Sequence, residues 1–359
     1  MAKKSIAYKN VLIARFSALG DVAMTVPAVY SVCRAYPGTQ FTMVTQQVAA
    51  SLFVGAPANL TVKGVDVKGR YRGPKGLWRL VGELSAERKI DAYIDLHDVI
   101  RSRLIGLFCR LRGIAVYRID KGRKEKRRLT NSHHKQLSPL TPTVERYAQT
   151  FRRAGLAFRD TFSSIFPDKA DSAQFSEITC PKREGEMWIA IAPFAKHAGK
   201  IYPPELMKTV VDKLSARPNT RIFLFGGGGE EKTMLENWAS ECDNIQSLAG
   251  KRYGFSKELA LLSHADVMLS MDSANMHLAS LVGLPVVSVW GATHPYCGFT
   301  GWHQRKGMEV QIDLPCRPCS VFGNKPCKRE DYACLRGIPP EMIVARIEQA
   351  LAENNKNKK

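Results

Sequence analysis

Residues 271–295, MDSANMHLASLVGLPVVSVWGATHP, decide the fold of this 359-residue chain. An apolar run stops at Asp272, a small-residue segment that favours a helix carries His277, and Gly283 and Pro285 precede a second apolar run. This order predicts strand, loop, helix, turn and strand, which is one βα unit of a parallel sheet. Asp272 and the first helix amides would then lie at the carboxyl edge of the sheet. Open α/β sheets bind ligands at that edge, and helix N-termini favour phosphate.

The same alternation of apolar runs and helix-forming segments occupies both halves of the chain. It restarts near residue 187, after a stretch without periodicity that carries Pro167 and Pro181. Two such series predict two doubly wound parallel-sheet domains, at 1–165 and 187–338, joined by a linker at 166–186 and followed by a helix and tail at 339–359. The expected strands are 11–16, 40–45, 90–96, 115–119, 188–194, 221–225, 266–271 and 285–290. The expected helices are 22–36, 76–88, 100–112, 143–154, 204–217, 230–240, 256–263 and 273–282.

The composition is that of a globular protein with a large positive charge. Hydrophobic residues make up 45% of the chain, and no run approaches the roughly 18 apolar residues that span a bilayer. The first apolar run is short and is broken by Arg15, which is typical of a first strand rather than a signal peptide, so we expect a cytoplasmic protein. The formal charge of +20 predicts attraction to nucleic acid, an acidic membrane surface or a phosphorylated substrate.

The positive charge is concentrated between Arg110 and Lys135. Ten Lys or Arg residues stand there against Asp120 and Glu125. Tyr117 is the only aromatic residue of that stretch, which argues against nucleic acid because base-stacking side chains are lacking. A solvated basic loop is the alternative interpretation.

Four of the nine cysteines lie close together in the sequence, at Cys316, Cys319, Cys327 and Cys334. Without a secretory signal, disulfides are disfavoured. Four thiolates in a short loop can form a structural zinc site, although the second pair lacks the close spacing usual for such sites. Packing thiols and redox-active thiols are the alternatives.

Two loops that follow predicted strands carry candidate catalytic groups. Gly20 and Asp21 come after the first strand and precede a helix. Asp21 is either a helix cap or a general base within hydrogen-bond reach of a hydroxyl group. Lys200 follows a strand of the second half, where a lysine can neutralise a departing diphosphate, and a solvated lysine is the alternative.

Two further features are weaker signals by themselves. Four glycines at 226–229 precede Glu230 and suit a backbone pressed against a base or ribose, although they also suit a flexible turn. A lone helical histidine such as His277 is more often a core residue than a ligand, but Asp272 lies close to it in the sequence.

Five blocks carry a family resemblance: RFSALGDV from Arg15, DLHDVIRS from Asp95, KIYP from Lys200, DSANMHLA from Asp272 and GATHP from Gly291. They occur in order and cover both halves of the chain. Together they resemble the ADP-heptose:lipopolysaccharide heptosyltransferase family, glycosyltransferase family 9.

The resemblance implies a GT-B fold, in which two Rossmann-like domains face a cleft, with the acceptor on the first domain and the donor on the second. Asp21 would be the base of an inverting transfer of heptose from ADP-heptose to the lipopolysaccharide inner core, with no cofactor required. Lys200 would contact the donor diphosphate. The donor-side residues that we expect are Lys200, Gly228, Glu230, Asp272, Ser273, Ala274, Met276 and His277, and the acceptor-side residues are Ser17, Gly20, Arg101, Arg123 and Lys126.

The chain departs from the family pattern at two places. Ala274 stands where the family usually has glycine, and four glycines before Glu230 replace a Gly-x-Glu arrangement that often contacts the donor ribose. The second departure leaves Glu230 only a candidate for that contact.

The resemblance also names partners for the basic surface. A phosphorylated lipid A–Kdo acceptor is acidic and membrane-embedded, which predicts peripheral attachment at the cytoplasmic face of the inner membrane. Two rival hypotheses are a GT-B enzyme with another nucleotide sugar, such as an epimerase, and a non-catalytic polyanion-binding protein.

Overall fold

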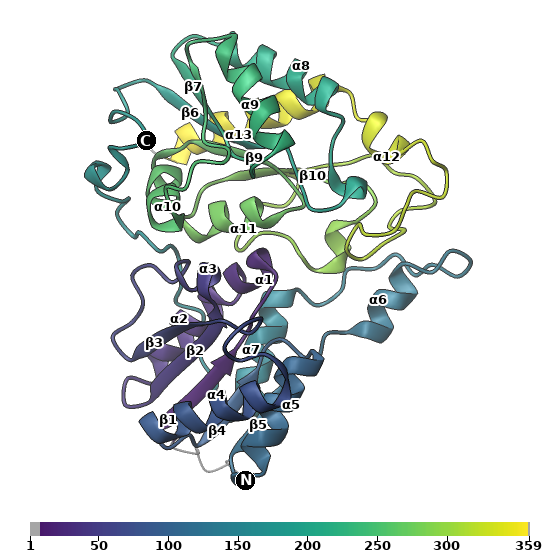
Figure 1. The fold of residues 1–359 in the computed structure, drawn as a ribbon. Helices are drawn as coiled ribbons and strands as arrows, with labels where there is room; N and C mark the ends of the chain where they lie inside the picture. The colour runs from purple at the N-terminus through teal and green to yellow at the C-terminus, as the bar shows by residue number, and fades with distance from the viewer. Residues whose placement is uncertain (1–7, 358–359) are drawn as a thin grey trace. The chain divides into compact units, whose positions relative to one another are not determined.

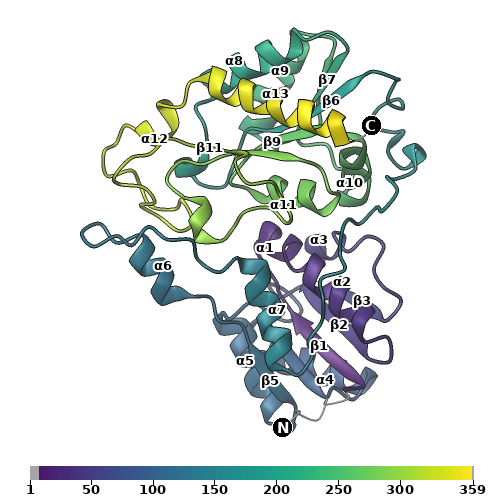
Figure 2. The same ribbon diagram turned by 180° about the vertical axis from the view of Figure 1, so that it is seen from behind.

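A computed structural model describes residues 8–357 of the chain, with side chains for residues 8–354 (Figures 1 and 2). The described residues form two compact units by their internal contacts. Unit 1 comprises 8–122 and 141–165, and unit 2 comprises 123–140 and the residues from 166 onward. The sequence prediction kept 123–140 with the first domain, whereas the contacts group this segment with unit 2.

Unit 1 is built on a five-stranded parallel sheet with strand order β3-β2-β1-β4-β5. This order matches five of the six strands of a Rossmann fold and places β1 at the centre. Because the strands are parallel, all of them end at the same edge of the sheet. The strands are β1 Asn10–Ala14, β2 Gln40–Gln46, β3 Leu60–Val65, β4 Ala92–Asp95 and β5 Ala115–Arg118.

Helices cover both faces of the sheet of unit 1. The helices α4 and α5 lie side by side on one face, where Leu77, Leu80 and Ile105 pack with Leu12 of β1. Figures 1 and 2 show α2 and α7 on the opposite face. The helices of unit 1 are α1 Leu19–Ala23, α2 Val26–Ala35, α3 Gln47–Ala50, α4 Gly73–Glu87, α5 Ile100–Arg110 and α7 Thr143–Arg153.

Unit 2 contains a six-stranded parallel sheet with order β11-β10-β9-β6-β7-β8. The central strands β6 and β9 are almost wholly buried, as expected for a sheet covered on both faces. The strands are β6 Met187–Ala192, β7 Thr220–Leu224, β8 Ile245–Ser247, β9 Val267–Met271, β10 Val286–Val289 and β11 Glu309–Val310.

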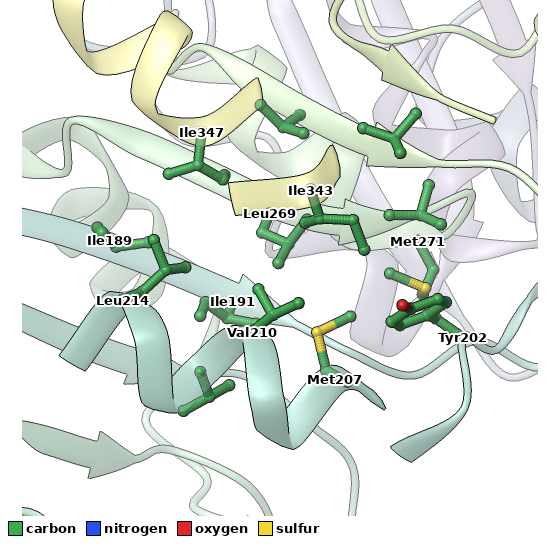
Figure 3. Close-up of a cluster of buried hydrophobic side chains, with 14 of the residues drawn as sticks. Ile189, Ile191, Tyr202, Met207, Val210, Leu214, Leu269, Met271, Ile343 and Ile347 are labelled. Carbon is green, nitrogen blue, oxygen red and sulfur yellow. The ribbon is translucent and has the colours of Figure 1, made fainter. Parts of the chain in front are cut away.

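The main core of unit 2 lies between its sheet and two helices that are far apart in sequence. Figure 3 shows Val210 and Leu214 of α8 and Ile343 and Ile347 of α13 converging on Leu269 of β9. The helices of unit 2 are α6 Arg123–Leu129, α8 Pro204–Ser215, α9 Glu230–Ser240, α10 Phe255–His264, α11 Ala274–Leu281, α12 Ala333–Arg336 and α13 Pro340–Asn357.

The segment 123–140 belongs to unit 2 because its far end is bonded there. The Lys135 ammonium donates to the carbonyls of Pro315 and Arg317 at 3.1 and 2.8 Å. The Leu140 amide donates to the Tyr296 carbonyl at 3.0 Å. The predicted basic loop therefore contains a helix, α6, and is attached to the cysteine segment.

Two doubly wound parallel sheets confirm the predicted fold class, and the structure adds three strands that the pattern did not reveal. The missed strands β3, β8 and β11 are outermost or short, so they lack a continuous apolar run. The helix expected at 22–36 is divided into α1 and α2, and the second piece carries Pro27 in its first turn. Within the described part of the chain, no helix is long and apolar enough to cross a bilayer.

The burial of α13 predicts a measurable contribution to stability. Replacing Ile347, which is fully buried, with alanine should lower the free energy of unfolding of unit 2 by about 2–5 kcal/mol, because it leaves a cavity. The control Met342→Ala changes a partly exposed residue of the same helix and should cost about 1 kcal/mol or less. Urea unfolding measures both changes, and equal losses would contradict the packing described.

Candidate active site

Asp21 lies at the carboxyl edge of the first sheet, in the first turn of α1, which follows β1 after a short loop. Its carboxylate forms a 2.6 Å ion pair with the Arg15 guanidinium and accepts the Ala18 amide at 3.2 Å. The side chain keeps 27% of its surface exposed. Ala18, not Asp21, is the N-cap residue of α1, so the N-cap alternative is wrong. Asp21 is the third residue of the helix, supports its start by accepting the Ala18 amide, and still presents an accessible carboxylate.

Arg15 is held rigidly under this carboxylate. The guanidinium is buried and donates to the Leu96 carbonyl at 2.9 Å. The Tyr147 hydroxyl donates to the Asp21 carbonyl at 3.2 Å, which ties the same turn to α7. Three segments thus fix the position of Asp21, which is what a directed base requires.

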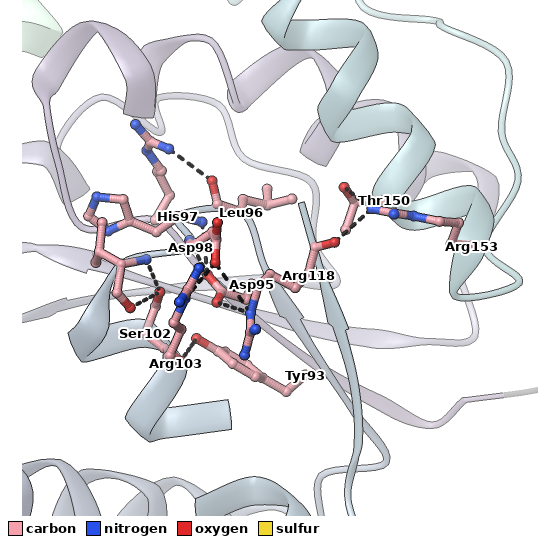
Figure 4. A network of polar contacts seen from close by, with 12 residues as sticks. Tyr93, Asp95, Leu96, His97, Asp98, Ser102, Arg103, Arg118, Thr150 and Arg153 are labelled. Carbon is pink, nitrogen blue, oxygen red and sulfur yellow. Dashed lines mark hydrogen bonds and ion pairs between the residues drawn. The ribbon is translucent and has the colours of Figure 1, made fainter. Parts of the chain in front are cut away.

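A second carboxylate shapes the neighbouring loop after β4 (Figure 4). Asp95 is fully buried, accepts the amides of His97 and Asp98 at 2.9 and 2.8 Å, and lies 3.3 Å from the Arg118 guanidinium. Asp95 stands in one of the five family blocks, but its role was not predicted from the sequence. An aspartate that ends a buried apolar strand was the available signal, because such a charge needs several partners.

Arg101 lies in the first turn of α5, directly after this loop, and shares the electrostatic environment of His97. Burial, followed by the charges of Arg15, Lys121 and Arg101, lowers the pKa of His97 to about 3. The neutral ring accepts the Phe16 amide through Nδ1 at 3.4 Å. Of the predicted acceptor-side residues, Ser17, Gly20 and Arg101 therefore gather with Asp21 at one edge of unit 1, whereas Arg123 and Lys126 lie on α6 in unit 2.

The second candidate centre is an ion pair at the carboxyl edge of the sheet of unit 2. Lys200 Nζ lies 2.9 Å from Asp272 Oδ2, and the Thr293 hydroxyl donates to the same oxygen at 2.8 Å. Asp272 and Thr293 are both buried. The structure thus brings together three of the sequence blocks, and Thr293 is a contact that the sequence analysis missed although its block was quoted.

The helix α11 starts beside this pair. Ser273 is its N-cap residue, and the Ser273 hydroxyl lies 3.2 Å from that of Ser270. Ala274 is partly exposed in the first turn, whereas Met276 and His277 are buried. His277 is therefore placed within the packed side of α11, next to the candidate centre.

The glycine loop before α9 is anchored by a glutamate of that helix. Glu231 accepts the Gly227 amide at 2.7 Å, whereas Glu230, the candidate for the ribose contact, is exposed. Gly228 is exposed, and a Cβ added to it would meet nothing within 4 Å. Gly229 has a positive φ of 65°, so glycine is required at that turn by the backbone.

Arg317, which lies in the cysteine segment, binds the loop at 290–293 that carries Thr293. Its buried guanidinium donates to the carbonyls of Gly291, Trp290 and Thr293 at 2.6, 3.1 and 3.0 Å. Burial lowers the pKa of this guanidinium, but the ring of acceptors satisfies its donors. The cysteine segment therefore supports the loop that carries Thr293.

The cysteines of this segment are free, and they do not provide a metal site in the described part of the chain. No three His, Cys, Asp or Glu side chains among the described residues are placed to hold a metal ion. Burial raises the pKa of Cys334 to about 11, which keeps that thiol protonated at neutral pH. The arrangement of Cys316, Cys319, Cys327 and Cys334 gives no support to the zinc hypothesis.

Two doubly wound parallel-sheet units, each with polar groups at the carboxyl edge of its sheet, are the architecture of the GT-B fold. Structures of the same fold include a glycosyl transferase family 9 protein from Veillonella parvula, with a TM-score of 0.75 and 18% identity over 97% of this chain and 98% of that one. Escherichia coli heptosyltransferase WaaC with ADP gives a TM-score of 0.64 and 18% identity over 95% and 99% of the two chains.

The family model described as glycosyltransferase family 9 (heptosyltransferase) matches residues 77–329, and this chain belongs to that family. Lipopolysaccharide heptosyltransferase 1 of Pseudomonas aeruginosa is 24% identical over 95% of this chain and 98% of its own length. Lipopolysaccharide heptosyltransferase 3 of Escherichia coli K12 is 25% identical over 93% and 96%. The resemblance found in the sequence is confirmed.

The low pKa of His97 predicts an acid-sensitive step in stability. The unfolded chain takes up a proton near pH 6.5 and the folded chain only near pH 3, so acidification favours unfolding throughout that window. The wild-type protein should lose about 2 kcal/mol more than His97→Asn when the pH falls from about 7.5 to about 5. Urea unfolding at both pH values measures this difference. The exposed control His134→Asn should behave like the wild type, and an unchanged slope in His97→Asn would contradict the assignment.

Proposed function

We propose that this protein transfers heptose from ADP-heptose to the inner core of a lipopolysaccharide precursor, with inversion at the anomeric carbon. The observation that carries the proposal is the Arg15–Asp21 pair, which presents a fixed and partly exposed carboxylate at a sheet edge. The names of the relatives support the substrate class, and Escherichia coli WaaC, whose structure holds ADP-2-deoxy-2-fluoro heptose, shares the fold.

In the proposed reaction, Asp21 acts as the general base. Its carboxylate accepts the proton of an acceptor hydroxyl as that oxygen forms a bond to the anomeric carbon. The bond between the anomeric carbon and the diphosphate oxygen breaks on the opposite side, and ADP leaves with the electron pair. Direct displacement of this kind inverts the configuration. Ser17, Gly20 and Arg101 are the proposed acceptor contacts in unit 1, and Arg123 and Lys126 are proposed ones on α6.

Lys200 is the proposed counter-charge for the departing diphosphate. Its ammonium is held by Asp272, whose Oδ2 also accepts from Thr293, so the cation is positioned before the substrate binds. We assign Asp272 to positioning because a buried carboxylate would repel phosphate oxygens if it met them directly. The amides at the start of α11, around Ser273 and Ala274, are the proposed diphosphate donors, with Met276 and His277 behind them.

Charge stabilisation by Lys200 and by helix amides supplies what a bound metal would supply, so the proposed reaction requires no cofactor. We propose that Gly228 and Glu230 contact the nucleoside, because both residues are exposed where the loop that follows β7 leads into α9. The acceptor is acidic and linked to lipid, so we propose peripheral attachment at the cytoplasmic face of the inner membrane.

The catalytic assignment is tested with Asp21→Asn. Purified protein, ADP-heptose and truncated core acceptors should give a heptosylated product by mass, and the variant should lower kcat by roughly 10²- to 10⁴-fold because it removes the base. Glu87→Gln, which changes an exposed carboxylate of the same unit, is the control. Full activity in Asp21→Asn would refute the mechanism, and transfer of a different sugar would refute the donor.

The role of Lys200 is tested against a lysine in the same loop. Lys200→Met should reduce kcat/KM for ADP-heptose by roughly 10²- to 10³-fold, because the leaving diphosphate loses its positioned cation. Lys196→Met removes an exposed charge four residues away and should leave kcat/KM near the wild-type value. Equal losses in the two variants would reduce the role of Lys200 to general electrostatic attraction.

A further inference from the structure

The helix α5 carries a row of apolar side chains that is largely exposed. Ile100, Leu107 and Leu111, the residue that follows the helix, are 81%, 47% and 67% exposed. They recur with Leu104, which is partly buried and also packs against the core of unit 1, at spacings of three and four residues, so they form one stripe along the helix. We call these four residues the α5 stripe.

The α5 stripe is additional to the face that anchors the helix. Ser102, Ile105 and Cys109 are buried, and the latter two join the core against the sheet. A surface helix needs only one apolar face to pack. The second face therefore requires a different explanation.

Arginines border the α5 stripe on both sides. At 100° per residue, Arg103 and Arg110 fall on one flank, and Arg101 and Arg112 on the other. Residues 100–113 contain no Asp or Glu. Asp98 pairs with Arg103 at 2.8 Å and offsets one of these four positive charges, so the rim remains positive.

A tryptophan of α4 continues the surface. Trp78 is 45% exposed and meets Phe108 edge to face, with ring centroids 5.2 Å apart. The Arg112 guanidinium lies over the Trp78 ring, 3.7 Å from its centroid. Tryptophan beside arginine on an apolar helix face is typical of residues at the headgroup level of a bilayer.

We propose that the α5 stripe, with Trp78 and the flanking arginines, is the surface by which this protein docks on an anionic lipid bilayer. The apolar side chains enter the acyl boundary, and the arginines bind lipid phosphates. This inference rests on the proposed function, because a lipid-linked acceptor gives the enzyme a reason to lie on a membrane.

The position of the helix fits that purpose. α5 begins at the carboxyl edge of β4, in the loop that His97 joins to the Asp21 segment. A bilayer in contact with Ile100 therefore lies beside the edge where the acceptor hydroxyl must arrive.

Charge distinguishes the bilayer from a second copy of the chain. In a two-fold dimer through the stripe, the arginine rim of one copy would face the same rim of the other. The helix α6 supplies a contrast, because it is basic but its one apolar residue, Leu129, is buried. Of these two basic helices, α5 is the one that combines charge with exposed apolar side chains.

The experiment is flotation of the full-length protein with vesicles of phosphatidylethanolamine and phosphatidylglycerol, and with vesicles of phosphatidylcholine alone. The double variant Leu107→Ser/Leu111→Ser should bind the anionic vesicles at least about tenfold more weakly, because two apolar side chains no longer enter the bilayer. Val48→Ser/Leu137→Ser, which changes two exposed apolar residues elsewhere, is the matched control and should bind like the wild type. Thermal unfolding should be unchanged in both.

Several outcomes would overturn the proposal. One is that the α5 variant binds the anionic vesicles as tightly as the wild type does, and another is that the wild type binds both kinds of vesicle equally well. A third such outcome is that the wild type forms a dimer, which the α5 variant abolishes without a change in vesicle binding. Transfer to a deacylated, water-soluble acceptor should be the same in wild type and α5 variant. If neither transfers heptose while vesicle binding still depends on the stripe, the proposed function fails and the docking surface stands.

Discussion

The parallel arrangement of strands is the constraint on which the rest of the structure depends. Because every strand of a sheet points the same way, each loop that follows a strand emerges at one edge. In unit 1 that edge receives the Asp21 turn and the Asp95 loop. In unit 2 it receives Lys200, Asp272 and Thr293. The parallel topology therefore brings residues that are distant in sequence together at one edge of each sheet.

Buried charges at these edges are tolerated because each has several partners. Asp95 accepts two amides and approaches Arg118, and Asp272 shares one oxygen between Lys200 and Thr293. Arg317 follows the same rule with carbonyl acceptors beneath the Thr293 loop. A lone buried charge would cost several kcal/mol. The same bonds that satisfy these charges also hold the loops rigid, which is the condition for directed chemistry.

The family and the fold could be predicted because they depend on short blocks and periodicity. The segment 271–295 and the Asp21 turn carried both, and they appear in the structure as a βα unit and a strand-to-helix turn. Edge strands such as β8 were missed because their stability comes from pairing with β7 rather than from their own three residues. The helix α6 was missed because a run of charges has no apolar period, and its placement depends on bonds such as those of Lys135.

The sequence by itself determined the alternating architecture, the family and the identities of the candidate base and counter-charge, since these follow from local patterns. Only the tertiary structure decided that Lys200 pairs with Asp272, that Glu231 binds the glycine loop, and that residues 123–140 join unit 2. It also decided which of the two apolar faces of α5 is buried. Sequence periodicity shows that a helix has apolar positions, but whether a neighbour covers them depends on contacts made by the whole fold.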